Sequence, residues 1–66
     1  MTTAAKRAWR FFLKAVKRDH KVHRAHMKAL LAFRRLPPTP TRSAAIESLQ
    51  KRYAAWRQCA RARRAA

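Results

Sequence analysis

Three histidines spaced three residues apart, His20, His23 and His26, are the side chains in this chain that most resemble a metal site. A metal needs ligands that converge, whereas residues three apart on a straight helix lie about 60° apart around its axis. The many neighbouring cations also repel a metal ion. We therefore expect no metal site, and we expect His20 and His23 to make hydrogen bonds within an interface.

Acid, base or nucleophilic catalysis has few candidate side chains. The two carboxylates, Asp19 and Glu47, fall in different segments and make no pair, and the chain has no glycine for a phosphate-binding loop. Cys59 is the single cysteine, so a disulfide within the chain is impossible, and no partner for a catalytic thiol is evident. We expect a reduced, apolar role for Cys59, no cofactor and no enzymatic activity.

The chemistry that the sequence does offer is the binding of anions. The 66 residues include 18 Lys and Arg but only two Asp and Glu, which gives a formal net charge of +16. Ordinary surface helices mix the two signs of charge through pairs four residues apart, and this chain has almost no acids for such pairs. The charge predicts a polyanionic partner, with RNA as the leading candidate.

Basic residues in the first half of the chain recur with the helical period. If residues 3–35 form one helix, ten of its eleven basic side chains fall between roughly 60° and 180° on its circumference, and Arg34 lies outside. Backbone contacts are expected, because the chain has no recognition-helix, zinc-finger, RRM or KH motif. The predicted nucleic-acid-binding residues are Lys6, Arg7, Arg10, Lys14, Lys17, Arg18, Lys21, Arg24, Lys28, Arg35, Arg61, Arg63 and Arg64.

Large apolar residues occupy the rest of that circumference and recur at helical spacing in the second half. A second helix could cover part of this surface but not Phe11, Val22 and Phe33, so we expect neighbouring proteins to cover the remainder. Aromatic residues at this spacing usually form a core, although stacking on unpaired bases is the alternative. The predicted protein-interface residues are Trp9, Phe12, Leu13, Val16, Met27, Leu30, Phe33, Ile46, Leu49, Tyr53 and Trp56.

Helices are the elements that must position these residues. Ala, Arg, Lys and Leu dominate the composition and favour helix, and the absence of glycine disfavours tight turns with positive φ. The one clear break lies at 36–41, where Pro37 and Pro38 end the first helix at about Arg35. Thr39 can cap a second helix that has Pro40 at its first position, and a start at Ser43 is the alternative.

We predict an all-α fold made of one small helical unit over residues 1–66. It comprises a long basic amphipathic helix over about 3–35, a Pro-rich linker over 36–41, a shorter helix over about 40–63 and a basic tail over 61–66. The short connection favours a helical hairpin or a V. Because so short and so charged a chain buries little core, we expect it to be ordered within a larger assembly.

These features predict a small structural RNA-binding subunit of a ribonucleoprotein. The leading candidate is an organellar (mitochondrial) ribosomal protein that neutralises rRNA phosphates and docks on neighbouring proteins. Residues 1–18 are basic, amphipathic and free of acids, as in a mitochondrial or chloroplast transit peptide, although a basic helix needs no targeting role. The alternative is an accessory subunit of a mitochondrial respiratory or ATP-synthase complex that lies on an anionic membrane surface.

Overall fold

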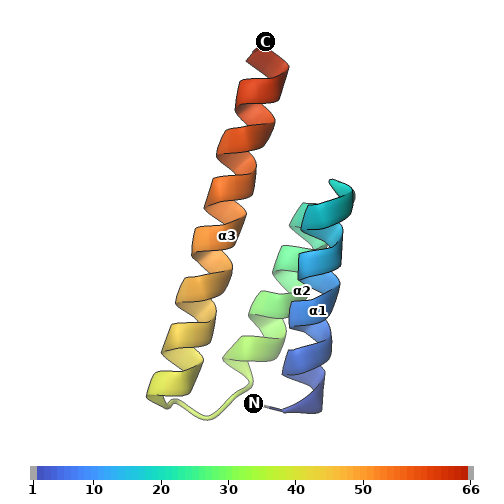
Figure 1. The fold of residues 1–66 in the computed structure, drawn as a ribbon. Helices are drawn as coiled ribbons and strands as arrows, with labels where there is room; N and C mark the ends of the chain where they lie inside the picture. Colours follow the sequence, from blue (N-terminus) through green and yellow to red (C-terminus); the bar gives the residue numbers. More distant parts are fainter. Residues whose placement is uncertain (1, 66) are drawn as a thin grey trace.

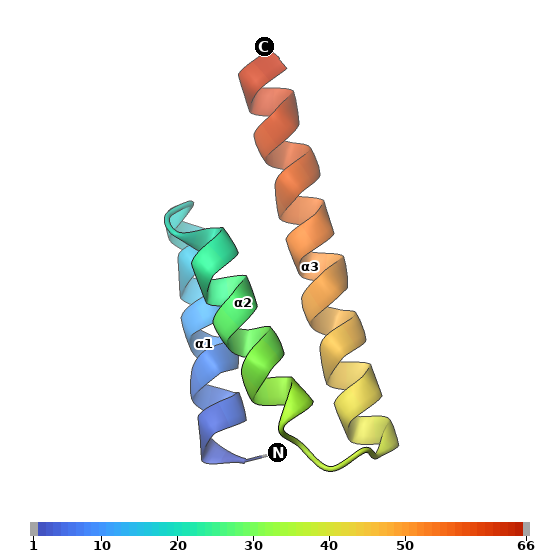
Figure 2. The same ribbon diagram turned by 180° about the vertical axis from the view of Figure 1, so that it is seen from behind.

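The computed structural model describes residues 2–65, which form three α-helices: α1 over Thr3–Arg18, α2 over Val22–Arg34 and α3 over Pro40–Ala65 (Figure 1). The predicted all-α class is confirmed, and the described residues contain no strand. Helices α1 and α2 make an antiparallel hairpin, and α3 runs back along α2 and extends past the α1–α2 turn, as Figure 2 shows from behind. The molecule measures 42 × 18 × 13 Å.

The predicted single helix over 3–35 is wrong, because the chain reverses direction at residues 19–21. Asp19 and Lys21 both adopt the left-handed region, with φ of 54° and 53°. Asp tolerates this region better than most non-glycine residues, because its short polar side chain can bond locally. A turn with positive φ therefore forms without glycine, contrary to the prediction.

Backbone hydrogen bonds around Asp19 close the end of α1. The Asp19 N–H donates to the Val16 carbonyl at 3.1 Å, and the His20 N–H donates to the Ala15 carbonyl at 3.1 Å. These two bonds are those of a Schellman motif, in which a left-handed residue satisfies the last carbonyls of a helix. The hairpin between α1 and α2 thus begins with a regular helix ending.

The start of α3 matches the sequence prediction. Pro40 is its first residue, and the Arg42 and Ser43 amides donate to the Thr39 carbonyl at 3.0 and 3.3 Å. The alternative start at Ser43 is therefore wrong. At the N-terminal end of α1, the Thr2 hydroxyl accepts a hydrogen bond of 3.2 Å from the Ala5 amide and so caps that helix.

Each helix contributes one fully buried large side chain to a common core: Phe12 from α1, Phe33 from α2 and Leu49 from α3. Burying a side chain of this size contributes roughly 1.5–3 kcal/mol. The other buried apolar residues are Ala5, Ala15, Val22, Ala25, Ala29, Leu30, Leu36 and Ala45. The chain therefore has an interior built from its own helices.

This core overturns much of the predicted protein interface. Phe12, Leu30, Phe33 and Leu49 are buried within the chain, so a neighbouring protein cannot contact them. Val22 and Phe33, predicted to lie beyond the reach of a second helix, are buried because the reversal after Arg18 folds α2 against α1. Among the remaining predicted interface residues, Met27 is exposed. The others are half-buried against the core: Trp9, Leu13, Val16, Ile46, Tyr53 and Trp56.

Candidate nucleic-acid interface

Every predicted nucleic-acid-binding residue is exposed, but these residues do not form one straight strip. Because the chain reverses after Arg18, the cations predicted for a single helix face belong to two antiparallel helices and the turn between them. Their distribution is Lys6, Arg7, Arg10, Lys14, Lys17 and Arg18 on α1, Lys21 in the turn, Arg24 and Lys28 on α2, Arg35 just after α2, and Arg61, Arg63 and Arg64 on α3.

One group of cations surrounds a shallow groove along the C-terminal half of α1 and the α1–α2 turn, which we call the basic groove. Its lining residues are Phe11, Lys14, Ala15, Arg18, His20 and Lys21. The ammonium group of Lys28 lies 5.3 Å from the centroid of the Phe11 ring, which places this α2 cation beside the same surface. The groove therefore combines cations from both helices with a half-exposed phenyl ring.

Few of the positive charges are neutralised within the fold. Lys51 pairs with Glu47 at 3.2 Å and Arg63 pairs with Asp19 at 3.2 Å. Since the chain has 18 basic and two acidic side chains, the other sixteen basic side chains have no carboxylate partner among residues 2–65. Their combined potential favours the approach of an extended anion.

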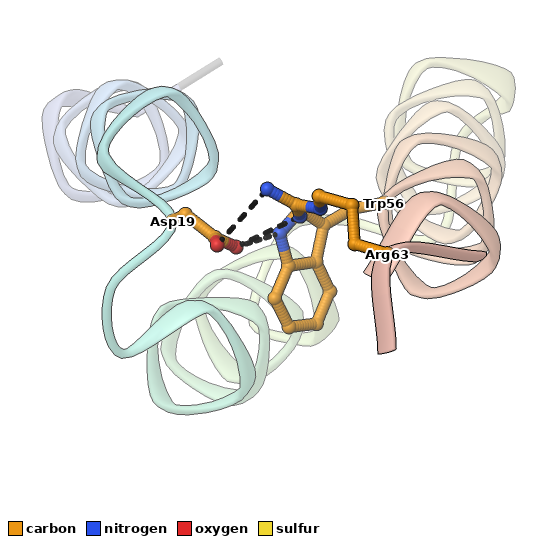
Figure 3. Close-up of polar contacts among 3 residues, drawn as sticks. All are labelled: Asp19, Trp56 and Arg63. Atoms are coloured by element: carbon orange, nitrogen blue, oxygen red, sulfur yellow. Dashed lines mark hydrogen bonds and ion pairs between the residues drawn. The ribbon is translucent and has the colours of Figure 1, made fainter. Parts of the chain in front are cut away.

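The carboxylate of Asp19 connects the α1–α2 turn to α3 (Figure 3). The Trp56 Nε1–H donates to Asp19 Oδ1 at 2.7 Å, and the Arg63 guanidinium donates to the same oxygen at 3.3 Å and pairs with Oδ2 at 3.2 Å. The indole hydrogen bond, which is the largest effect, lowers the pKa of Asp19 below its ordinary 3.8; desolvation opposes it, and the Arg63 and Arg64 charges add to the lowering. The carboxylate is thus ionised at neutral pH and engaged within the fold.

Three aromatic rings stack where α2 meets α3. The His26 ring lies 4.0 Å from the Tyr53 ring at an interplanar angle of 11°, and Tyr53 lies 6.0 Å from Trp56 at 16°. Beside this stack, Nδ1 of His23 shares a hydrogen bond of 2.8 Å with the Tyr53 hydroxyl, so His23 bonds within the fold, between α2 and α3, while the predicted interface hydrogen bonds of His20 and His23 stay a prediction.

His26 is buried, with 6 % of its surface exposed, and neither of its ring nitrogens has a hydrogen-bond partner among the described residues. Burial lowers the pKa of His26, and electrostatic repulsion from the His23 imidazole lowers it further. The Gln50 side chain opposes this lowering of the pKa. His26 therefore serves the fold as a neutral ring. No three His, Cys, Asp or Glu side chains of the described part gather into a metal-binding group.

A second concave surface lies between the α1–α2 turn and the distal half of α3, and we call it the aromatic–arginine hollow. Its two adjoining parts share His23, Trp56, Ala60 and Arg64. The part nearer the turn adds Asp19, Lys21, Val22 and Arg63, and the other part adds Tyr53, Arg57 and Arg61. This site was not predicted from the sequence, because its residues come from segments at least 30 positions apart that only the folded hairpin brings together.

Comparison with protein-family models, curated proteins and solved structures finds no match to this chain. None of the described helices is both long enough and apolar enough to cross a lipid bilayer.

Proposed function

We propose that this chain is a small structural RNA-binding subunit of a ribonucleoprotein, most closely an organellar (mitochondrial) ribosomal protein. The observation that carries the proposal is the set of sixteen basic side chains without carboxylate partners in residues 2–65, distributed over a small folded scaffold. Such a surface neutralises phosphates and releases the counterions that surround them, which favours binding without reading the base sequence.

The basic groove is the part of the surface best suited to a phosphate backbone. Lys14 and Arg18 of α1 and Lys21 of the turn line it, and Lys28 of α2 borders it beside Phe11, so one stretch of phosphates can contact all four cations. Long Lys and Arg side chains adapt to the spacing of phosphates, and the scaffold fixes where their backbones begin. The binding surface is then compact, about the length of the hairpin, rather than a strip along one long helix.

Mitochondrial location enters this proposal through residues 1–18, whose composition is that of a targeting helix. In the folded chain, α1 supplies the fully buried Phe12 and the buried Ala5 and Ala15 to the core. Removal of this segment would expose the remaining core, so a targeting role requires a signal that stays on the protein. Neighbouring subunits would contact the exposed apolar residues Met27 and Leu31 on α2.

Fluorescence anisotropy with a labelled RNA tests the proposal. A variant carrying Lys14→Gln, Lys21→Gln and Lys28→Gln should bind more weakly, and the slope of log K against log salt concentration should fall by about three. The matched control carries Lys6→Gln, Arg10→Gln and Lys17→Gln, which remove the same charge from the other flank of α1. Equal losses in both variants would disprove the groove, and a wild-type affinity independent of salt would disprove phosphate binding.

An accessory subunit on an anionic membrane surface is the second candidate. Phe11, Met27 and Leu31 are 45, 43 and 53 % exposed on helices rich in cations, a combination that suits the boundary between headgroups and acyl chains. Flotation with vesicles that contain an anionic phospholipid, compared with neutral vesicles, tests it. Met27→Ser combined with Leu31→Ser should abolish vesicle binding and leave RNA binding unchanged if this second function operates.

A further inference from the structure

We propose that the aromatic–arginine hollow binds one unpaired nucleotide of the RNA, with its base stacked on Trp56 and its phosphates held by the arginines of α3. The inference rests on the proposed function and deepens it. Backbone contacts at the basic groove require no unpaired base, whereas this second site recognises one. Three features of the hollow carry it: an aromatic stack that ends there, a space above the last ring, and cations around the rim.

The aromatic stack leads from the interior to the hollow. His26 is buried, Tyr53 is half-buried against it, and Trp56 is the third ring and lines both parts of the hollow. In Figure 3 the helices are seen end-on and the indole is seen open-faced, so the ring lies across the helix axes. The hydrogen bond from Trp56 to Asp19 holds the indole in this orientation. A nucleobase would extend the stack by one ring.

Ala60, one turn beyond Trp56 on α3, leaves room for that base. Its side chain ends at Cβ, and Ala60 lines both parts of the hollow together with Trp56. The part nearer the turn has a volume of about 470 Å³. Binding sites for small molecules commonly measure about 300–1,000 Å³, so a base with its sugar fits this space.

Cations border the aromatic surface on both sides. Lys21 lies at the turn, and Arg57, Arg61 and Arg64 lie along α3, all without a carboxylate partner in the described chain. The Arg57 guanidinium is 5.8 Å from the Tyr53 ring centroid, which keeps this cation beside the stack. Asp19 is the one carboxylate of the hollow, and Arg63 neutralises it.

The ligand must therefore be both planar and anionic, which is the chemistry of a nucleotide. A base within a duplex is already stacked on both faces and cannot extend the protein's rings. Stacking on an aromatic side chain tolerates any base, because every base has a π face. The hollow thus favours single-stranded segments, loops or ends. A free nucleoside triphosphate has the same chemistry and is distinguished by experiment.

The intrinsic fluorescence of Trp56 tests the inference on the full chain. Trp9→Phe leaves Trp56 as the single tryptophan, and the ring at position 9 keeps its aromatic packing. We expect a single-stranded RNA oligonucleotide to quench this fluorescence, and an abasic oligonucleotide with the same number of phosphates to quench it little. At salt concentrations that suppress phosphate contacts, the RNA should bind about tenfold more tightly than the abasic strand.

Ala60→Leu separates stacking from folding. The larger side chain fills the space above the indole while the Trp56–Asp19 hydrogen bond is kept, and Leu is a good helix former. Ala62→Leu, on the exposed side of the same helix, is the matched control. We expect Ala60→Leu to remove the tenfold preference for RNA over the abasic strand, and Ala62→Leu to retain it, with unchanged circular dichroism for both variants.

The outcomes distinguish this inference from the proposed function. If RNA and the abasic strand bind equally and Ala60→Leu changes nothing, the nucleotide site is disproved while phosphate binding stands. If neither strand binds at low salt, the proposed function itself fails. Quenching by adenosine triphosphate at lower concentrations than by the oligonucleotide would assign the hollow to a free nucleotide and overturn the RNA inference.

Discussion

The indole N–H of Trp56 donates to the carboxylate of Asp19 at 2.7 Å, although 37 positions separate the two residues in the sequence. Asp19 also adopts the left-handed conformation that ends α1, so one residue both reverses the chain and joins the reversal to α3. Arg63 completes the contact with an ion pair. The relative position of the hairpin and α3 therefore depends on Asp19, which is the only carboxylate side chain in the sequence before Glu47.

Substitutions of Asp19 should separate its two roles. Asp19→Asn keeps an acceptor for the Trp56 N–H and a residue that tolerates positive φ, but it removes the charge that pairs with Arg63. Asp19→Ala removes the acceptor, the charge and the local preference. We expect both variants to lower Tm, with the larger decrease for Asp19→Ala. Equal Tm values for the two variants would show that the indole hydrogen bond contributes nothing.

Acidification should destabilise the fold through His26. Burial lowers the pKa of His26 below its ordinary value of 6.5, so the unfolded chain binds a proton at a higher pH than the folded chain does. Well above pH 6.5 the imidazole is neutral in both states and contributes no pH dependence. As pH falls below 6.5, the unfolded state binds more protons and the free energy of unfolding decreases. Urea denaturation at pH 7.5 and pH 5.5 measures this difference.

His26→Phe is the matched variant for the pH experiment, because it keeps a flat ring against Tyr53 and cannot take a proton. The decrease in stability between pH 7.5 and pH 5.5 should be smaller in this variant than in the wild type. Asp19 does not obscure the comparison, since its pKa is lowered from 3.8 and its contribution is lost only in more acidic solution. An unchanged pH dependence in His26→Phe would assign the effect to other groups.

Local signals in the sequence were sufficient for the helical class and for the break before α3. Pro37 and Pro38 cannot continue a helix, and Thr39 followed by Pro40 is a strong start, so both features depend on residues adjacent in the chain. The first reversal was missed because the apolar period continues through it and glycine is absent. The available signal was Asp19, an acid at the unfavourable C-terminal end of a helix and a residue that tolerates positive φ.

The candidate site was predictable only in part, because its residues meet through the reversal. The exposure of the basic residues follows from charge alone, and their choice as anion ligands required no fold. The division of apolar residues between core and surface could not be predicted without the turn at residues 19–21. Phe33 is buried and Leu31 is exposed, although both belong to the same helix. The stack of His26, Tyr53 and Trp56 could not be predicted without knowing that α2 packs on α3.

Phe33 and Leu31 should respond very differently to truncation. Phe33 is fully buried, and replacing such a side chain by Ala costs about 3–5 kcal/mol. The core of a chain this small supplies only about 3–5 kcal/mol, so Phe33→Ala should leave most molecules unfolded. Leu31→Ala, on the exposed side of the same helix, should change stability by less than about 0.5 kcal/mol. Circular dichroism during urea denaturation checks both, and similar losses would contradict the assigned core.

Lys21 should be replaceable by glycine with a gain in stability. Its φ of 53° lies in the left-handed region, where a side chain beyond Cα costs roughly 1–2 kcal/mol and glycine costs little. After the larger entropy of glycine in the unfolded chain is subtracted, Lys21→Gly should stabilise by about 0.5–1 kcal/mol. Arg24→Gly removes the same charge within α2 and should destabilise by about 1 kcal/mol. Destabilisation by both would show that the turn differs from the one described.

Salt should affect folding and RNA binding in opposite directions. Sixteen basic side chains without carboxylate partners in residues 2–65 repel one another, and at 0.1 M ionic strength charges are screened over about 10 Å. Added sodium chloride should therefore raise Tm of the free chain, whereas RNA affinity should fall with a log–log slope of several units because fewer counterions are released. Thermal melts and anisotropy titrations over one salt series measure both. A Tm that falls with salt would contradict this prediction, because it would mean that the two ion pairs of Asp19 and Glu47 stabilise the fold more than the repulsion destabilises it.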